Sequence, residues 1–305
     1  MEQISTFDIF KIGVGPSSSH TMGPWLAAQI FLKSCDWTLI ESIQIKLFGS
    51  LSKTGKGHGT DIAVMLGLEG YDVKTIDVNE IDNYIAMITK DHKININQKL
   101  QITFNPLKDI EFLNEKLPAH PNALTFIAKL TDGTCREETY YSVGGGFVSP
   151  ENEHKTEEKA ISKKAFPFPI QSEADILGYI KEKEIGIYDI VYQNELAWRS
   201  ESEIDAEIHE LWTTMKNCIY RGCHKDGLLP GALMVTRRAH SISSNLIGDK
   251  EYSNTDEWIE AIKSCDHSFT NVTKWVSCFA LSVNEENARS EEHTSELQSL
   301  AYLVC

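Results

Sequence analysis

Four hydroxyl groups and one imidazole occupy five consecutive positions near the start of the chain. They belong to Ser17, Ser18, Ser19, His20 and Thr21, which stand between two Gly-Pro pairs and precede an apolar run. Proline is well tolerated in a first helical turn, so the segment predicts a helix N-terminus, where free backbone N–H groups attract anions. A helix cap needs only one hydroxyl, and this segment has four. We therefore predict that it binds a small molecule that carries a carboxylate.

A second imidazole lies in a glycine-rich segment, residues 50–61, between a strand-like run and a helix-like run. Gly57 and Gly59 flank His58 and leave its ring little shielded, and Lys53 lies nearby. The glycine spacing does not match the phosphate-loop pattern, which argues against a nucleotide site. Two interpretations stay open: a flexible basic loop, or a general base beside cations that hold a substrate carboxylate.

Four other polar residues have two interpretations each. Asp61 follows His58 and either orients its ring or caps the next helix. His120 and Asn122 flank a proline, and they belong either to a plain turn or to the lining of a cleft between domains. Asn284 lies in a helical pattern and shares a helix face with a second asparagine three positions later, so it is either a surface residue or polar lining of the same cleft.

The cysteines predict no metal site by their spacing. The chain has seven of them, an odd and scattered set that is typical of reduced thiols in a cytosol. Cys218 and Cys223 have the spacing that opens one iron–sulfur pattern, but no third cysteine follows at the required distance. We therefore interpret this pair as thiols in or near a core.

Composition narrows the class of protein. The 305 residues are 41% hydrophobic, enough to bury a sizeable core, and they carry a net charge of −15. That charge argues against nucleic acid or an anionic membrane surface as a partner. The chain has neither an apolar run long enough to span a bilayer nor the basic and apolar start of a signal peptide. These features predict a cytoplasmic protein with a small-molecule substrate.

The two histidine segments together resemble one family, the iron–sulfur L-serine dehydratases of bacteria. The resemblance rests on residues 7–21 and 54–61 and extends, in the order of the family, over essentially residues 1–288. Shorter matching stretches are residues 120–122, 141–147, 229–233, 237–239 and 283–288. Each stretch alone is a weak indication, whereas their combination is highly specific.

The resemblance implies a carbon–oxygen lyase that converts L-serine to pyruvate and ammonia and that is a homodimer in its full-length form. A [4Fe–4S] cluster would act as a Lewis acid on the serine hydroxyl while a base removes the Cα proton. His58 is the expected base and His20 the alternative, with a capping or packing role equally open for His20. The residues expected to bind substrate are Ser17, Ser18, Ser19, Thr21, Lys53, Asp61, His120, Asn122 and Asn284.

Two other classes of function were compared with this interpretation. A non-catalytic serine-binding or regulatory module is the alternative, because the first domain of the family is similar to the allosteric substrate-binding domain of some phosphoglycerate dehydrogenases. The long helical continuation of the chain argues against it. A Ser/His hydrolase is disfavoured, since the chain has no G-x-S-x-G elbow.

The expected fold class is α+β, with a small α/β sheet domain, a linker, and the first part of an all-helical catalytic domain. The resemblance implies that these are the beta domain of the family in residues 1–148, a linker in 149–171 and a partial alpha domain in 172–288. In the first domain the patterns predict helices over residues 23–35, 60–69 and 80–90, strands over 42–48, 72–78 and 99–104, and a hairpin of 124–130 with 134–143. In the last they predict helices over 172–183, 200–220, 232–245, 254–264 and 271–286.

The resemblance ends after Ala288. Residues 289–299 look instead like the translation of a sequencing adapter, so we expect residues 289–305 to be non-native. Proteins of this family carry their cluster-binding cysteines downstream of the stretch that corresponds to residues 284–287. We therefore expect the metal ligands beyond the end of this chain, no cluster bound to it, and no dehydratase activity of the chain as given.

Overall fold

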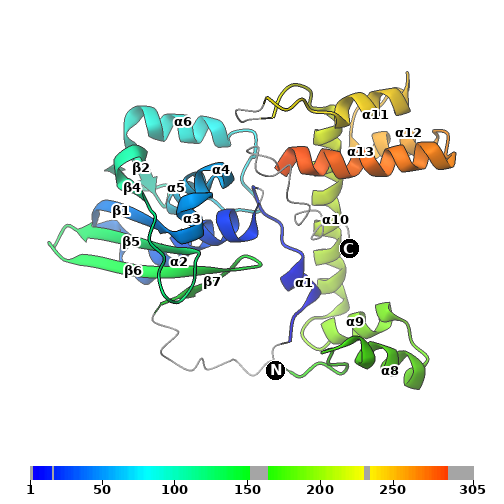
Figure 1. Ribbon diagram of the computed structural model, residues 1–305, viewed down its shortest axis with the longest axis horizontal. Helices are drawn as coiled ribbons and strands as arrows, with labels where there is room; N and C mark the ends of the chain where they lie inside the picture. Colours follow the sequence, from blue (N-terminus) through cyan, green and yellow to red (C-terminus); the bar gives the residue numbers. More distant parts are fainter. Residues whose placement is uncertain (1–2, 16, 152–163, 230–233, 288–305) are drawn as a thin grey trace.

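The computed structural model describes residues 3–15, 17–151, 164–229 and 234–287. A sheet with its covering helices forms the first part of the molecule, and a set of helices forms the second (Figure 1). This arrangement confirms the expected α+β class. The expected linker, residues 149–171, lies partly outside the described residues, and the expected tail, residues 289–305, lies wholly outside them.

The described residues of the first part form a five-stranded sheet with the strand order β4-β1-β5-β6-β7. Strands β1 and β4 pair in parallel, and the other neighbours are antiparallel. The predicted hairpin is the β5–β6 pair. The strands are β1 (Ile40–Phe48), β4 (Ile110–Leu113), β5 (Ala123–Leu130), β6 (Cys135–Gly144) and β7 (Phe147–Pro150).

One face of this sheet is buried and the other is exposed, as the alternation in β1 predicts. Ile43, Ile45 and Leu47 are at most 2% exposed, whereas the polar residues between them point outward. Two helices, α2 (Gly23–Ser34) and α5 (Thr60–Leu68), pack against each other, and α2 lies against the sheet, where the ring of Phe31 stacks on Phe126 at 5.0 Å. Both helices and strand β1 were predicted from the sequence.

Two predictions for the first part are wrong. The glycine-rich segment is not an open loop, because it forms two short helices, α3 (Gly49–Lys53) and α4 (Gly55–His58). The strand predicted over residues 72–78 is a series of turns. The Asp72 carboxylate accepts hydrogen bonds from the backbone N–H groups of Lys74 and Thr75, and this local bonding replaces strand pairing.

The remaining elements of the first part lie around the sheet. Helix α6 (Ile81–Asp91) confirms the predicted third helix and packs beside a separate two-stranded ribbon. That ribbon consists of β2 (Lys93–Ile96) and β3 (Leu100–Thr103), of which only β3 was predicted. Short helical turns η2 (Trp37–Leu39) and α7 (Pro106–Asp109) precede β1 and β4.

The second part is helical in its described residues, as predicted. A long helix, α10 (Glu201–His224), runs through it, with α8 (Glu173–Lys183) and α9 (Ile187–Glu195) at one end and α11 (Ala239–Ile247), α12 (Thr255–Lys263) and α13 (Phe269–Asn287) at the other (Figure 1). Helix α9 was not predicted. The helix predicted from residue 232 begins only at Ala239, because a bridge between Leu228 and Thr236 occupies the preceding stretch.

Glycine allows the two longest helices of this part to approach closely. A Cβ atom on Gly222 of α10 would lie 2.4 Å from the backbone oxygen of Ser282 in α13. Around this contact, Cys223, Trp258, Trp275 and Cys278 form a buried core. The core interpretation of Cys223 is confirmed, whereas Cys218 beside it is half-buried.

A buried charge cluster joins the two parts. The Glu195 carboxylate, 4% exposed, accepts hydrogen bonds from the Ser5 hydroxyl at 2.8 Å, from Thr6 N at 2.6 Å and from Arg199 at 2.9 Å. The Arg199 guanidinium also lies 4.7 Å from the centre of the Phe7 ring. The first helical turn, α1 (Thr6–Ile9), is thereby docked onto the junction of α9 and α10.

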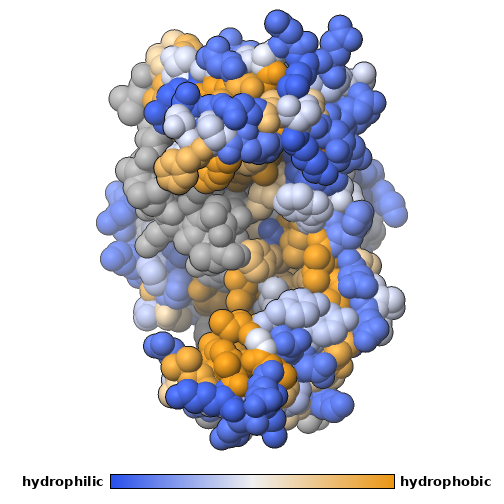
Figure 2. All heavy atoms as spheres, turned by 90° about the vertical axis from the view of Figure 1, so that its right-hand side faces the viewer, coloured by the Kyte–Doolittle hydropathy of each residue, from blue (hydrophilic) through white to orange (hydrophobic). Residues whose placement is uncertain are grey.

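The face of the helical part that lies on the right-hand side of Figure 1 carries a band of apolar side chains (Figure 2). Exposed apolar residues of this part include Ile187 and Tyr188 in α9, Trp212 in α10 and Val276 in α13. In the part of the chain that the structure describes, every helix is too short or too polar to cross a membrane.

Candidate functional site

The hydroxyl-rich segment folds into a π-helical turn, η1 (Ser18–Met22), that continues directly into α2. Ser17 caps this turn, since its Oγ accepts a hydrogen bond from His20 N at 3.1 Å. The backbone N–H of Gly23 reaches back to the carbonyl of Ser18. Turns of this wide type are rare and often occur at functional sites. Ser18, the first residue of this turn, is half-buried.

Hydroxyl groups surround the His20 imidazole on both sides. Ser19 Oγ lies 2.9 Å and Ser17 Oγ 3.5 Å from Nδ1, and Ser50 Oγ of α3 lies 2.9 Å from Nε2. A hydroxyl can donate or accept, so these contacts are compatible with either neutral tautomer of His20. Ser50 is a site residue that the sequence analysis did not single out, although it lies in the glycine-rich segment.

The His58 imidazole has a more defined state. It is 8% exposed at the end of α4, and its Nδ1 lies 2.7 Å from the backbone oxygen of Thr54. A carbonyl oxygen can only accept, so Nδ1 must carry the proton. In the neutral ring the lone pair then resides on Nε2, which is the arrangement that a general base requires.

The fold brings the two histidines into contact. Their ring centres are 4.7 Å apart with an interplanar angle of 32°. Two threonines connect the segments: Thr21 Oγ1 donates to the carbonyl of His58 at 3.0 Å, and Thr60 Oγ1 donates to the carbonyl of His20 at 2.6 Å. Thr60 and Thr54 are further residues that the sequence analysis missed. Their sequence indications are their nearness to His58 and their place in residues 54–61, which carry the family resemblance.

The turn at residues 120–122 contacts the start of α3, beside Ser50. Ser50 N donates to the backbone oxygen of Pro121 at 2.9 Å, and Asn122 Nδ2 donates to the backbone oxygen of Ser142 at 3.3 Å. His120 Nδ1 accepts from Asn122 N at 3.1 Å. Gly49 has a positive φ of 56°, and a Cβ there would lie 2.3 Å from the Pro121 oxygen. The predicted turn is therefore packed against the start of α3.

Three other predicted residues lie in different surroundings. Asp61 is in the first turn of α5, where burial raises the pKa of its carboxyl and Ile62 N donates to it at 3.0 Å. Lys53 is exposed in the last turn of α3. Asn284 lies near the C-terminal end of α13, which packs on α10 and α11. Their roles in substrate binding stay predictions.

Comparison with known proteins decides the family. The model of the serine dehydratase beta chain matches residues 5–153, and that of the serine dehydratase alpha chain matches residues 182–292. The chain belongs to the serine dehydratase family. It is 38% identical over 290 residues to L-serine dehydratase 1 of Escherichia coli, and 36% identical to the L-serine dehydratases of Haemophilus influenzae and Streptomyces coelicolor. These matches cover 93% of this chain and 60–61% of the relatives, so the chain spans about three fifths of their length.

The acidic stretch near the end of α13 has structural partners. The Glu285 carboxylate, 4% exposed, accepts from Arg238 N at 2.7 Å and so caps the start of α11. Glu286 forms ion pairs with Arg237 at 2.9 Å and with Arg221 at 3.3 Å. These bonds join parts of two stretches that carry the family resemblance, residues 237–239 and 283–288.

The described residues do not fit an iron–sulfur cluster. Such clusters are held by cysteine thiolates, commonly four. Cys223 and Cys278 have sulfur atoms 3.6 Å apart, and their hydrogen bond together with burial raises the pKa of the Cys278 thiol. In the described ranges, however, no three His, Cys, Asp or Glu side chains are arranged to hold a metal ion.

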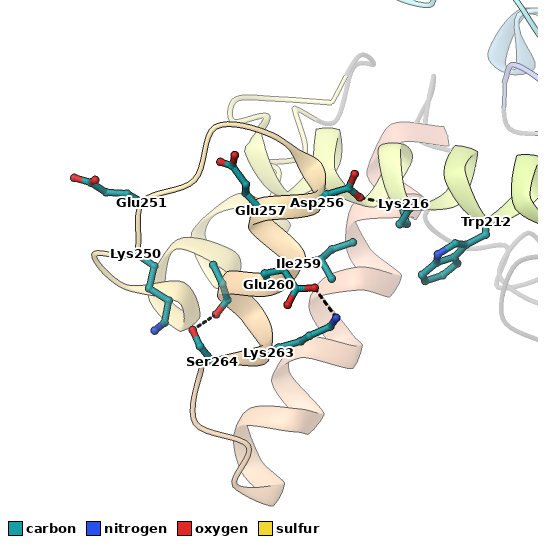
Figure 3. A pocket seen from close by; sticks show the side chains of 11 residues that line it. Trp212, Lys216, Lys250, Glu251, Asp256, Glu257, Ile259, Glu260, Lys263 and Ser264 are labelled. Atoms are coloured by element: carbon teal, nitrogen blue, oxygen red, sulfur yellow. Dashed lines mark hydrogen bonds and ion pairs between the residues drawn. The ribbon is translucent and has the colours of Figure 1, made fainter.

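A surface hollow of about 960 Å³ lies far along the chain from the histidines, between α10 and α12 (Figure 3). Four of its charged side chains form two pairs, Lys216 with Asp256 at 2.9 Å and Lys263 with Glu260 at 2.6 Å. Its lining contains no imidazole or thiol. Self-paired surface charges are poorly suited to proton abstraction, and we place the candidate active site at the two histidines instead.

Proposed function

We propose that this chain supplies the substrate-binding and proton-abstracting part of an L-serine dehydratase, which converts L-serine to pyruvate and ammonia. The observation that supports this most strongly is the state of His58. Its Nδ1 proton is held by the Thr54 carbonyl at 2.7 Å, and the ring lies 4.7 Å from His20 among serine and threonine hydroxyls.

The reaction needs one base and groups that bind the substrate carboxylate. Nε2 of His58 takes the proton from Cα of L-serine, and the Cα–H electron pair forms the double bond as the Cβ–O bond breaks. The leaving hydroxide takes up one proton to become water, and return of the Cα proton from His58 balances that proton, so that 2-aminoacrylate and water are the products of this step. Addition of water to its imine form releases ammonia and leaves pyruvate. His20 is the alternative base.

The hydroxyl groups of η1 are proposed to hold the substrate carboxylate. Ser17 and Ser19 place their Oγ atoms 3.4 Å apart at the start of the turn, next to the His20 ring. Hydroxyl donors and the free N–H groups of a helical start both favour an anion. Ser18, Thr21, Lys53, Asp61, His120, Asn122 and Asn284 complete the set of residues proposed to contact substrate.

The proposal includes the [4Fe–4S] cluster that the resemblance implies, without assigning it ligands among the described residues. When bound, it would supply Lewis-acid assistance to the departing hydroxyl. Its ligands are proposed to lie outside the described residues. A homodimeric complete enzyme is a prediction of the same resemblance, and a cytoplasmic location is a prediction from the composition.

Binding of L-serine to the chain tests the first half of this proposal. The protein is labelled with ¹⁵N at its histidine rings and titrated with L-serine, with L-alanine as the matched ligand that lacks the hydroxyl. We expect saturable shifts at the rings of His20 and His58, while the exposed His92 and His267 stay unchanged. Unchanged rings at His20 and His58 would overturn the assignment of the site.

Pyruvate formation tests the second half. The assay uses this segment completed to the length of its relatives, purified without oxygen and supplied with iron and sulfide. Turnover of L-serine to pyruvate is the expected result. Binding of L-serine without any turnover would support the non-catalytic serine-binding module in its place.

A further inference from the structure

Two buried threonines cross-connect the histidine segments in a reciprocal way. Thr21 lies in η1 beside His20, yet its hydroxyl bonds to the carbonyl of His58; Thr60 follows His58 closely, yet its hydroxyl bonds to the carbonyl of His20. Thr21 is 4% exposed and Thr60 is fully buried. We propose that this threonine pair is a clamp that sets the position of the two imidazoles relative to each other. Its part in catalysis rests on the proposed function.

The clamp acts close to the rings, because each threonine hydroxyl donates to the backbone oxygen of one of the two histidines. Fixing the carbonyl of His20 or His58 fixes the backbone from which its ring projects, so only the two side-chain torsions remain free. Those torsions are restrained separately, by Thr54 for His58 and by Ser19 and Ser50 for His20. The 4.7 Å separation of the rings therefore follows from bonds on the backbone and on the ring.

A comparison with a neighbouring threonine separates the clamp from ordinary helical bonding. The Thr54 hydroxyl donates to the backbone oxygen of Ser50, four residues back in the same segment. The hydroxyls of Thr21 and Thr60 instead reach partners 37 and 40 residues away. Helix α5 has Gly59 at its N-cap with no side-chain cap bond, so Thr60 does not cap its own helix.

Glycines in each segment make room for the clamp. A Cβ on Gly15 would lie 2.5 Å from Cγ2 of Thr21, and a Cβ on Gly55 would lie 3.0 Å from Oγ1 of Thr60. Each threonine thus packs against a glycine of its own segment while it bonds to the other segment. This gives a physical reason for glycine at two positions of the stretches that carry the family resemblance.

The test replaces the hydroxyl but keeps the shape. Thr21→Val and Thr60→Val each remove the hydroxyl that donates to the carbonyl of a histidine, whereas Thr21→Ser and Thr60→Ser keep the donor. The matched control is Thr125→Val: Thr125 is also 4% exposed, and its hydroxyl is bonded to Thr139 within the sheet at 2.8 Å. The readout is the nuclear Overhauser effect between the ring protons of His20 and His58, with the ¹⁵N shift of His58 Nδ1.

We expect both valine variants to lose most of the inter-ring effect well below their melting temperatures, and both serine variants to retain it. Thr125→Val should lower the melting temperature without changing the rings. If the rings of the valine variants stay in place while only the melting temperature falls, the threonines are packing residues and the clamp is wrong. Should one valine variant fail to fold, the other decides, because it acts on the opposite carbonyl.

Kinetics on the completed protein add the catalytic readout. Thr60→Val changes no residue proposed to contact substrate, so it should lower kcat by about 10²-fold, the scale of a misplacement near 1 Å, with a smaller change in KM for L-serine. The serine variants should recover kcat. Absence of dehydratase activity in the unmodified protein would contradict the proposed function, whereas the ring measurements would still decide whether the clamp exists.

Discussion

At the scale of single residues, His58 and His20 are distinguished by what holds their rings. A backbone carbonyl fixes the proton of His58 on Nδ1, while hydroxyls that can donate or accept contact both nitrogens of His20. A base must carry its lone pair on the nitrogen that takes the proton, and the Thr54 carbonyl, by holding the proton on Nδ1, leaves the lone pair of the neutral ring on Nε2. This difference favours His58 as the base and a binding or orienting role for His20.

His58→Ala, made in the protein completed to the length of its relatives, should lower kcat by about 10²–10⁴-fold, the usual contribution of a general base. KM for L-serine should change little, because the hydroxyls of η1 would still hold the carboxylate. His20→Ala should show the reverse balance, with a raised KM and a milder loss of kcat. Steady-state kinetics of both variants check this, and an inactive His20→Ala beside an active His58→Ala would exchange the two roles.

Asp61 should make stability depend on pH in an unusual direction. Burial raises the pKa of its carboxyl above the ordinary value of 3.8, so the folded state favours the protonated form. The stability from this group is complete below pH 3.8 and is lost as pH rises through the raised pKa. Asp61→Asn should therefore raise the melting temperature more at pH 7 than at pH 3.

The control for this prediction is Asp132, whose pKa is lowered mainly by the hydrogen bond from the Thr134 hydroxyl. Ionised Asp132 favours the folded state above pH 3.8, so the change in melting temperature caused by Asp132→Asn should have the opposite sign at pH 7. Melting curves at the two pH values measure both variants. The same sign for both would contradict the assignment of burial as the cause at Asp61.

At the scale of elements, the position of the site depends on how closely α2 and α5 approach. The two histidine segments lead into these helices: η1 continues into α2, and α5 begins two residues after His58. Gly67 in α5 faces the backbone of Trp25 in α2, and a Cβ there would lie 2.5 Å from the Trp25 oxygen. The spacing of the helices therefore leaves no room for a larger residue.

Gly67→Ala should lower the free energy of unfolding by about 1–3 kcal/mol, because overpacking forces the helices apart. The matched control is Gly178→Ala in α8, where no atom lies within 4 Å of the added Cβ. That change should raise stability by about 0.5–1 kcal/mol through helix propensity alone. Chemical denaturation of both variants gives the comparison, and equal effects would contradict close packing at Gly67.

At the scale of the whole molecule, the docking of the N-terminal turn connects the helical part to the site. Residues 5–7 are held by Glu195 and Arg199, and the chain reaches Ser17 about ten residues later. Sheet and helices each have a core of their own, so this buried cluster is one of the contacts that join them. Its carboxylate is buried, and removing its charge leaves donors without a full partner.

Glu195→Gln should speed hydrogen exchange of the Thr6 amide by about 10–100-fold, which corresponds to the roughly 1.5–3 kcal/mol of a hydrogen bond to a charged group. Glu207→Gln is the control, since Glu207 pairs with the same Arg199 at 3.3 Å but is 40% exposed. A surface pair of this kind contributes about 0–1 kcal/mol. Exchange followed by mass spectrometry on the N-terminal peptide measures both, and equal rates would show that the cluster does not hold the turn.

The sequence by itself determined the class of fold, most of the longer helices, the central strand and the main hairpin. These elements have strong local periodicity, as in β1, where alternate residues are buried. The short elements were missed or misjudged, because α3 and α4 have few residues and depend on contacts with the 120–122 turn and with η1. The turns at residues 72–78 depend on one aspartate side chain, which outweighed a strand-like pattern.

The sequence also predicted that two histidine segments carry the chemistry, because their residue types and their resemblance to a family are local properties. Only the tertiary structure decided that the two rings touch, which ring has a fixed tautomer, and that Thr21 and Thr60 bond across the segments. Such bonds join residues 37 and 40 positions apart, and their geometry is set by the packing of α2 against α5. No sequence pattern within either segment specifies how the two segments lie relative to each other, so the arrangement of the site exists only in the folded chain.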